Sequence, residues 1–432
     1  MINPISIVTY ILIIILLTGS HSTPELKQNS KQVKWISKRV ITFTPIAGGV
    51  GFINEDGTSE RYLQLPEKKD RRWSGLDAIF PDKRNCILTS YENYSITANV
   101  TGKMYNRLWK YNLSAGELTE LITNGRPADQ IFCAALLSDG KHMLCSVSAE
   151  NHKFQLLYLT DLDGKEWKLL SGQEFIYGIQ VNHHSTRIAF HIASEGYTIN
   201  STDMEGKDRK HVTGKEGHLF FGPEWSPDDK WLAYLDCDTR KEPSHHYADL
   251  CIGRPDGSEH RVVTNGQSQY FGTAYGTKDH RCGGSNTTSW SPDGKYLVYS
   301  KLSPGAHHDA AYKPELGNHL ENTFSPESAK GGCVIEWLDP FSGHEIPVTH
   351  YLDGKWDFRG VVSPDGKKLT YTSAKVAGRG EIFICNIDST GNMFLTAGKD
   401  GLGADFPGGS MLLYWKIVSW LNKKSLPTKG RQ

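Results

Sequence analysis

Apolar runs alternate with tight-turn sequences along most of this chain. The segment 224–234 (EWSPDDKWLAY) matches 289–299 (SWSPDGKYLVY) and 362–371 (VSPDGKKLTY). In each copy an apolar run leads into a Pro-Asp turn, and a second run of alternating apolar and polar residues follows. This pattern is typical of a β-hairpin. A second hairpin follows most copies, for example 249–257 with 261–264, so each unit is predicted to hold four antiparallel strands.

Turn anchors of this kind recur at similar spacing. They are centred on Asp82, Asp139, His184, Asp228, Asp293 and Asp365. An N-terminal piece near 40–63 and a C-terminal piece near 411–420 can supply a further, shared unit. Four-stranded units at this spacing predict an all-β fold, a seven-bladed β-propeller of four-stranded antiparallel blades, as a single domain over 40–425. A β-solenoid would need shorter and more regular repeats.

The N-terminus does not share the repeat. The apolar run from Ile5 to Leu17 is short for a membrane span and has the length of a signal-peptide core. Residues 1–22 are therefore predicted to be a signal peptide and 23–39 a leader, which makes the protein secreted or periplasmic. A retained single-helix anchor is the alternative interpretation.

Composition narrows the function. The chain has 432 residues, with 48 Lys and Arg against 48 Asp and Glu. A formal net charge of zero argues against general nucleic-acid binding, which needs a basic surface. The 43 glycines, with 19 Tyr and 11 Trp, favour a turn-rich all-β fold.

The Trp-Ser-Pro-Asp-Gly-Lys turn at 290–295 and the Arg-Pro-Asp-Gly-Ser turn at 254–258 resemble the TolB-type (WD40-like, PD40) propeller repeat. The resemblance covers nearly all of 40–410. That repeat occurs in translocation proteins, peptidase propellers and polysaccharide lyases such as oligogalacturonate and ulvan lyases. A peptidase would add an α/β-hydrolase domain with a Gly-x-Ser-x-Gly elbow, and a TolB protein an extra N-terminal domain; neither is expected here. The resemblance implies the fold and leaves the function open.

The order of the strands predicts which face of the propeller holds the functional site. The tight turns share one face, and the long loops near 236–247, 265–285 and 303–332 share the other, where functional sites are usually built. His, Arg, Tyr and Gln gather in and beside these loops. His183 and His184 replace a Pro-Asp pair and are expected in a solvated turn on the opposite face.

These residue types suit β-elimination of a uronic acid, which needs a cation on the C5 carboxylate, a base for the C5 proton and an acid for the leaving O4. The resemblance to uronate lyases implies the same reaction. We predict Arg281 or Arg240 on the carboxylate, His218 (pointing at the central funnel) or His246 as the base, and Tyr275 as the acid. Substrate contacts are predicted from Gln267, Asn286, Trp356, His245 and Arg359. At a non-reducing end the same chemistry expels water, so a lyase and a dehydratase both fit.

Two other functions stay open. A non-catalytic propeller would bind glycan or protein through aromatic platforms. A glycoside hydrolase would need two carboxylates, and Asp236, Asp238, Glu242 and Asp249 lie on the predicted face. The expected partner is an acidic polysaccharide or oligosaccharide, bound by a monomer.

The cysteines allow a metal site or a disulfide. Cys237, His280 and Cys282, with His245 or His246, are suitable zinc ligands, although their spacing matches no standard motif. Such a structural zinc would hold the loops; calcium at nearby aspartates is the alternative. Cys237 and Cys251 bracket one loop, and export would permit a disulfide between them. No cofactor is required by the predicted reaction.

Overall fold

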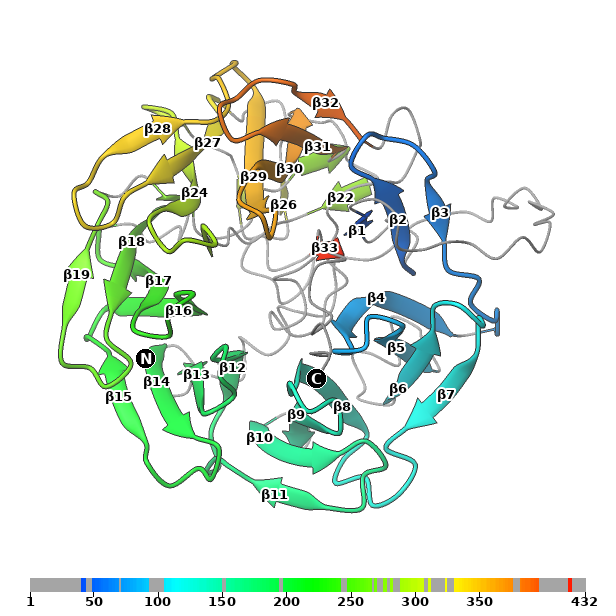
Figure 1. Ribbon diagram of the computed structural model, residues 1–432. Coiled ribbons are helices and arrows are strands. Elements are labelled where there is room, and N and C mark those ends of the chain that lie inside the picture. Colours follow the sequence, from blue (N-terminus) through cyan, green and yellow to red (C-terminus); the bar gives the residue numbers. More distant parts are fainter. Residues whose placement is uncertain are drawn as a thin grey trace, which may run out of the picture.

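A computed structural model describes residues 40–43, 49–69, 71–92, 105–149, 153–193, 197–241, 247–265, 268–269, 275–277, 280–282, 288–306, 310–311, 323–324, 330–375, 381–395 and 419–421. The regular elements of these residues are β-strands, and none is a helix that could cross a membrane. The sheets are arranged in a ring around a central axis (Figure 1), which is the architecture of a β-propeller.

Four sheets have four antiparallel strands each. The first holds β1 (Val40–Phe43), β2 (Gly51–Asn54), β3 (Arg61–Tyr62) and β33 (Ser419–Leu421). The second holds β4 (Arg72–Ile79), β5 (Asn85–Glu92), β6 (Tyr105–Asn112) and β7 (Leu118–Leu121). The third holds β8 (Gln130–Leu136), β9 (His142–Ala149), β10 (Phe154–Asp161) and β11 (Trp167–Leu169). The fourth holds β12 (Ile176–Val181), β13 (Arg187–Ile192), β14 (Thr198–Asp203) and β15 (Lys210–Thr213).

The later strands join into one 13-stranded sheet. It contains β16 (His218–Trp225), β17 (Leu232–Asp238), β18 (Tyr247–Gly253) and β19 (His260–Val262), here called the β16–β19 unit. It continues through β20 (Ser268–Gln269), β23 (Ser289–Trp290), β24 (Leu297–Leu302), β27 (Cys333–Leu338) and β28 (Glu345–Pro347). It ends with β29 (Lys355–Val362), β30 (Lys368–Lys375), β31 (Glu381–Asn386) and β32 (Met393–Phe394). Two short hairpins stand apart: β21 (Tyr275–Thr277) with β22 (His280–Cys282), and β25 (Ala310–Ala311) with β26 (Thr323–Phe324).

The two ends of the chain meet in one sheet. β1 pairs antiparallel with β33, so that Ile41 lies opposite Trp420. The predicted sharing of a unit between N- and C-terminal pieces is therefore observed. The described part of the C-terminal strand covers Ser419–Leu421, and the rest of the predicted piece near 411–420 lies outside the described residues.

The predicted hairpin turns are confirmed at each of the turn anchors. In the best-preserved copy, Ser291 Oγ lies 2.6 Å from Asp293 Oδ1 and accepts the backbone N–H of Tyr296 at 3.0 Å. Gly294 has φ of 71°, a left-handed conformation that glycine adopts without steric cost. The serine thus accepts a backbone N–H of the turn and contacts the aspartate, while the glycine supplies the left-handed conformation that reverses the chain direction.

The tryptophan of this motif ties neighbouring units together. Trp225 donates its indole N–H to the Gln180 carbonyl in β12 at 3.2 Å, and Trp290 donates to the Glu224 carbonyl in β16 at the same distance. Both rings are buried. The repeat therefore encodes the packing between units as well as the hairpin itself.

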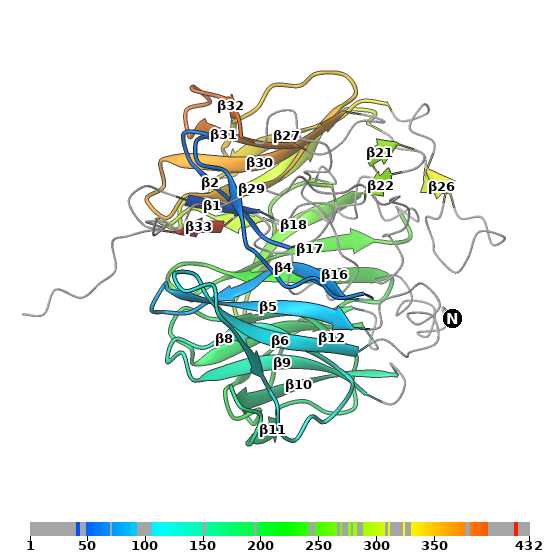
Figure 2. The same cartoon turned by 90° about the vertical axis from the view of Figure 1, so that its right-hand side faces the viewer.

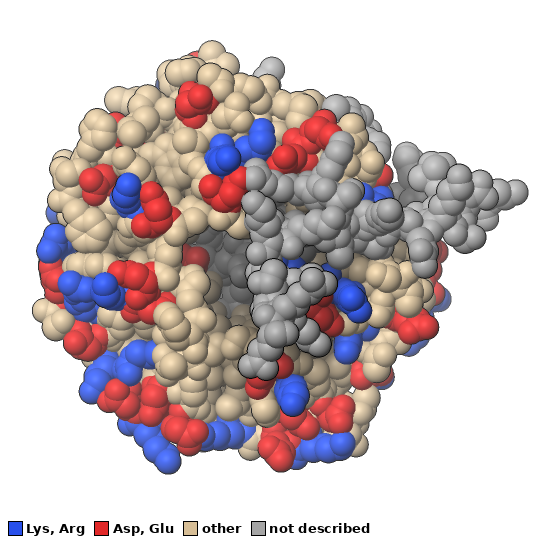
Figure 3. Space-filling model, in the orientation of Figure 1, with Lys and Arg blue, Asp and Glu red and all other residues tan. Residues whose placement is uncertain are grey.

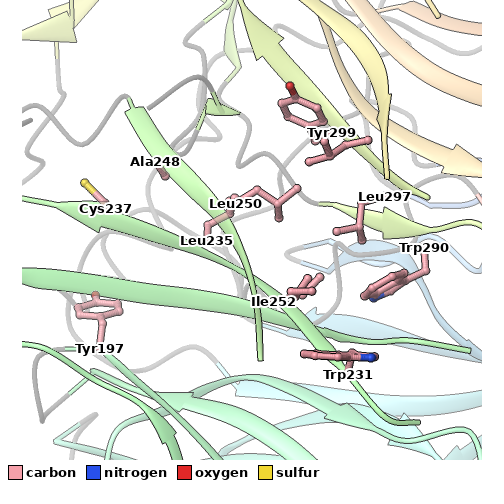
Figure 4. Close-up of a cluster of buried hydrophobic side chains, with 12 residues drawn as sticks. Tyr197, Trp231, Leu235, Cys237, Ala248, Leu250, Ile252, Trp290, Leu297 and Tyr299 are labelled. Atoms are coloured by element: carbon pink, nitrogen blue, oxygen red, sulfur yellow. The ribbon is translucent and has the colours of Figure 1, made fainter. Parts of the chain in front are cut away.

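The hydrophobic core lies between adjacent sheets. Figure 4 shows one such layer, where Leu250 and Ile252 of β18 pack near Leu297 and Tyr299 of β24. Full burial of each such side chain contributes about 1.5–3 kcal/mol. On the face seen in Figure 3, acidic and basic side chains are interspersed, in keeping with a net charge of zero.

The long connections gather at one end of the propeller. β21, β22 and β26 lie on the same side as the C-terminal end of β17, at the right of Figure 2. This agrees with the face predicted from strand order.

Candidate active site

A pocket of about 620 Å³ opens between the end of β15 and the β16–β19 unit. Inner strand β16 and outer strand β19 both contribute to its wall, so the pocket extends across the width of this unit, and His218, which was predicted to point at the central funnel, lines it. Its polar lining residues are Lys215, His218, Asp236, Asp238, Lys241, Asp249 and His260.

His218 is the first residue of β16 and is held by a carboxylate. The side chain is 8% exposed, and its Nδ1 lies 2.7 Å from Oδ1 of Asp236 on β17. The imidazole also stacks on Phe220, with ring centroids 5.9 Å apart. Because Phe220 lies opposite Asp236 in the β16–β17 register, strand pairing alone brings the three side chains to one face of the sheet.

Arg240 fixes the protonation state of this histidine. Its Nη2 lies 3.0 Å from His218 Nε2, and its Nε and Nη2 donate to Asp238 at 2.9 and 3.2 Å. A guanidinium can only donate hydrogen bonds, so Nε2 must be the acceptor. In this arrangement Nδ1 donates its proton to Asp236, and Nε2 faces the guanidinium, with Oδ2 of Asp238 3.6 Å away.

Gly217 makes the approach of Arg240 possible. Its φ is +75°, and a Cβ at this position would lie 3.0 Å from Cδ and Nε of Arg240. The Gly217 carbonyl also accepts hydrogen bonds from the backbone N–H and the hydroxyl of Thr239, at 2.9 and 2.7 Å. These bonds anchor the start of the loop that carries Arg240.

Three aspartates in the pocket have different environments. Burial raises the pKa of Asp236, with the neighbouring Asp249 acting in the same direction and the His218 hydrogen bond opposing it. Asp249 lies directly opposite Asp236 across the β17–β18 pair. The hydrogen bond from Arg240 holds the pKa of Asp238 well below its usual range.

His260 is a second imidazole in the pocket that the sequence analysis did not select. Its Nδ1 lies 2.7 Å from the hydroxyl of the fully buried Tyr234, and burial lowers its pKa. In the sequence, His260 stands in the outer strand after a turn, a position with no catalytic motif. The only available signal was the register that sets this strand beside β18.

The described lining can attract an anion. Lys215 and Lys241 line the pocket with Arg240 at its rim, against Asp236, Asp238 and Asp249. Asp238 is paired with Arg240, so an anionic ligand would share that guanidinium with Asp238 or contact Lys215 or Lys241.

The structure brings together His218 and Arg240 among the predicted site residues, and it places two others elsewhere. Trp356 is only 1% exposed, so its ring is part of the core and presents no face to a sugar. Arg359 is 5% exposed, at a bulge in β29 with φ of 58°. Both residues lie on the inner strand β29. Alternate side chains of that strand face opposite neighbouring sheets, so both residues are buried.

Several predicted site residues cannot be placed. His245, His246, Gln267 and Asn286 lie outside the described residues. Tyr275, Arg281, His280 and Cys282 belong to the β21–β22 hairpin, where Tyr275 pairs with Cys282 and Thr277 with His280, but their side chains lie outside the described part. Their roles remain predictions.

The structure corrects the predictions for Cys237. Cys251 is a free thiol, and the two cysteines face opposite sides of the sheet because Cys251 pairs with Tyr234, three residues before Cys237. Cys237 is fully buried in an apolar cluster, turned away from the pocket. Cys237 is therefore not positioned as a zinc ligand in the pocket, while the side chains of His280 and Cys282 lie outside the described residues.

His183 and His184 lie in an exposed turn, as expected, but they contact the next unit. Their Nδ1 atoms lie 2.7 and 2.5 Å from the two carboxylate oxygens of Asp229. Asp229 takes the glycine position of its Ser-Pro-Asp-Gly turn, with φ of 58°. Two departures from the repeat, one in each turn, therefore form a single inter-unit contact.

No protein-family model and no curated protein sequence matches the chain. Solved structures do. Puromycin hydrolase aligns with a TM-score of 0.52 and 12% identity, over 84% of this chain and 52% of that one, so this chain spans about half of that protein. A TolB protein of Agrobacterium tumefaciens aligns at 0.41 and 15% identity, over 81% and 98%.

The matches also include an oligogalacturonate lyase of Vibrio parahaemolyticus, with a TM-score of 0.48 and 12% identity over 81% of this chain and 91% of that one. The TolB and oligogalacturonate lyase structures that the sequence resembles are thus among the structures to which the chain is similar. At such low identity, similarity extends to the fold alone.

Proposed function

We propose that this protein is a carbon–oxygen lyase that performs β-elimination at C4–C5 of a uronic acid, as a polysaccharide or oligosaccharide lyase or as a dehydratase. The observation that supports this is the state of His218. A neutral imidazole whose Nδ1–H is bound to a carboxylate and whose Nε2 accepts is prepared to take a proton. The guanidinium beside it is suited to a planar carboxylate.

In the proposed reaction the substrate carboxylate binds Arg240, which lowers the pKa of the adjacent C5 proton. His218 Nε2 takes that proton, the C5–H electrons form the C4=C5 double bond, and the C4–O4 bond breaks with its electron pair on O4. Asp236 stabilises the imidazolium that forms at His218. A proton delivered to O4 completes the step, releasing a shortened glycan or, at a free 4-hydroxyl, water.

The test is the ultraviolet absorbance of the 4,5-unsaturated product on ulvan, pectate, glycosaminoglycans, alginate and their oligomers. Wild type should generate the chromophore on at least one substrate, and His218→Gln should lose about 10²–10⁴-fold in rate. His142→Gln is the matched control, because His142 also bonds an aspartate through Nδ1, at 2.6 Å, in an exposed turn away from the pocket. A chromophore without new reducing ends indicates dehydration; no chromophore with any substrate refutes elimination.

A glycoside hydrolase is the second candidate, because Asp236 and Asp249 lie directly opposite each other in the pocket. Paired carboxylates with separated pKa values are the usual hydrolase machinery. New reducing ends without a chromophore would favour it, whereas binding without turnover would favour a glycan-binding propeller.

We also propose seven blades, export directed by residues 1–22, and a monomer that acts on acidic glycans. The repeated turns and the shared β1–β33 sheet support the blade count. N-terminal sequencing of exported protein tests the cleavage site, and light scattering tests the monomer.

A further inference from the structure

The pocket contains two imidazoles whose hydrogen bonds favour different tautomers. His218 and His260 both line it, and both rings contact Phe220, with centroid distances of 5.9 and 6.4 Å. The first comes from the inner strand β16 and the second from the outer strand β19. A ligand in the pocket would therefore have one imidazole near each end of Phe220.

The protonation of His260 follows from a contact that the fold repeats. In the next two groups of strands, Tyr299 donates its hydroxyl proton to Glu345, and Tyr371 donates to Asn392 Oδ1 at 3.0 Å. Both acceptors stand beside the outer strand, as His260 does. Tyr234 repeats the contact with His260 Nδ1 at 2.7 Å, and Thr213 also hydrogen-bonds the Tyr234 hydroxyl.

When the tyrosine donates to Nδ1, the proton of a neutral His260 is on Nε2. Burial lowers the pKa of His260, which favours this neutral form. The sister positions carry an acid and an amide, so a histidine is not needed to hold the tyrosine. At His260, which lines the pocket, the imidazole that accepts at Nδ1 also carries an N–H donor at Nε2, whereas an ionised Glu345 only accepts.

We propose that His260 is the general acid of this site, donating its Nε2 proton to the leaving O4 while His218 Nε2 takes the C5 proton; this rests on the elimination proposed above. The two imidazoles have complementary tautomers: Nε2 accepts in His218 and donates in His260. As the C4–O4 bond breaks, O4 receives the His260 proton and leaves as a neutral alcohol or water. The transfer leaves His260 as an imidazolate, hydrogen-bonded at Nδ1 by the Tyr234 hydroxyl, which then regains a proton at Nε2 from solvent.

The decisive experiment varies the leaving group. His260→Gln keeps an acceptor for Tyr234, as Glu345 does in the sister contact. On a natural oligouronide the variant should lose about 10²–10⁴-fold in kcat. On a uronide that carries 4-nitrophenol at O4, which leaves without protonation, it should stay within about 10-fold of wild type, whereas His218→Gln should fail on both substrates.

A second measurement tests the structural premise without turnover. Nitrogen-15 NMR of histidine-labelled protein should show the Nε2–H tautomer at His260 and the Nδ1–H tautomer at His218. Tyr234→Phe, with its fold checked by thermal unfolding, should weaken the preference at His260 and lower kcat on the natural substrate more than on the nitrophenyl one.

The outcomes separate the two proposals. If wild type forms no unsaturated product, elimination fails and this inference fails with it. If wild type is active and His260→Gln is unaffected, or equally impaired on both substrates, only the role of His260 is refuted. An Nδ1–H tautomer at His260 refutes it as well.

Discussion

Asp236→Asn tests the proposed base most directly, because it changes the charge beside His218 while keeping the shape of the side chain. Asp236 Oδ1 lies 2.7 Å from His218 Nδ1, and both residues are buried. After His218 accepts a proton, the imidazolium and the carboxylate are opposite charges in contact. The Asp236→Asn amide removes that attraction only once His218 is protonated. The substitution should therefore destabilise the transition state and leave the ground state almost unchanged.

The size of the effect follows from the geometry. Unit charges about 4 Å apart interact by about 4 kcal/mol at an effective dielectric of about 20. Every 1.36 kcal/mol of transition-state stabilisation is a factor of ten in rate. Because solvent screens part of the interaction between the two charges, kcat should fall by about 10²–10³-fold. The KM should change little, because Asp236 contacts the imidazole and not the proposed carboxylate subsite at Arg240.

Stability should respond in the opposite direction. Burial and the neighbouring Asp249 raise the pKa of Asp236, so its carboxylate costs stability above the unfolded pKa, and this cost grows as pH rises. The amide should therefore be neutral or stabilising at pH 7 while the enzyme loses activity. That combination separates a catalytic effect from unfolding.

The assay is initial-rate formation of the unsaturated product, with thermal unfolding in parallel. Asp139→Asn is the matched control, because it removes an aspartate–imidazole contact of 2.6 Å at His142, in an exposed turn. A fall in kcat of less than about threefold for Asp236→Asn, or a change confined to KM, would refute His218 as the base.

Three further variants test the surrounding structure. Gly217→Ala should lose about 1 kcal/mol of stability and raise the KM for acidic substrates, because its φ is +75° and its Cβ would displace Arg240; an unchanged KM in the kinetic assay would argue against that arginine as the anion contact. Although burial opposes it, hydrogen bonding from the neighbouring turn lowers the pKa of Asp229, so Asp229→Asn should cost about 1–2 kcal/mol at pH 7. In urea unfolding, that cost should shrink as pH falls below the usual aspartate range, because the carboxylate of wild type becomes protonated there. Burial raises the pKa of Asp77 to about 8, so wild type should lose stability relative to Asp77→Asn as pH rises from about 4 to 8; parallel urea curves across that range would contradict this.

The fold was predictable from the repeat because each turn is stabilised by residues within the turn itself. Ser291, Asp293 and Gly294 satisfy and close a hairpin within six residues, and Trp290 binds the preceding strand. These are local interactions, so they are visible as a sequence motif. The boundaries of β33 were less predictable, because that strand is defined by pairing with β1 nearly 380 residues away along the chain.

Site residues were predictable only where their position along the chain, next to or within a loop, determines where they lie. His218 was selected because it stands just before an inner strand and Arg240 because it lies in a long loop, and the structure brings them together across the β16–β17 pair. Trp356 was selected on the same reasoning and proved to be core, because an inner strand has buried residues at its end as well as along its length. Loop proximity therefore identifies candidates but does not determine which way a strand residue faces.

His260 shows what pattern reading misses and what comparison of the repeats recovers. Its chemistry depends on Tyr234, 26 residues earlier, and on a register that no single segment displays. Alignment of the three Tyr contacts makes it visible: the tyrosine has an acceptor at this position in each group of strands, and the acceptor His260 lines the pocket described above. The contact with Tyr234 needs only an acceptor at His260 Nδ1, so the fold does not require the Nε2 proton. Removing that proton should therefore lower catalysis without destabilising the fold.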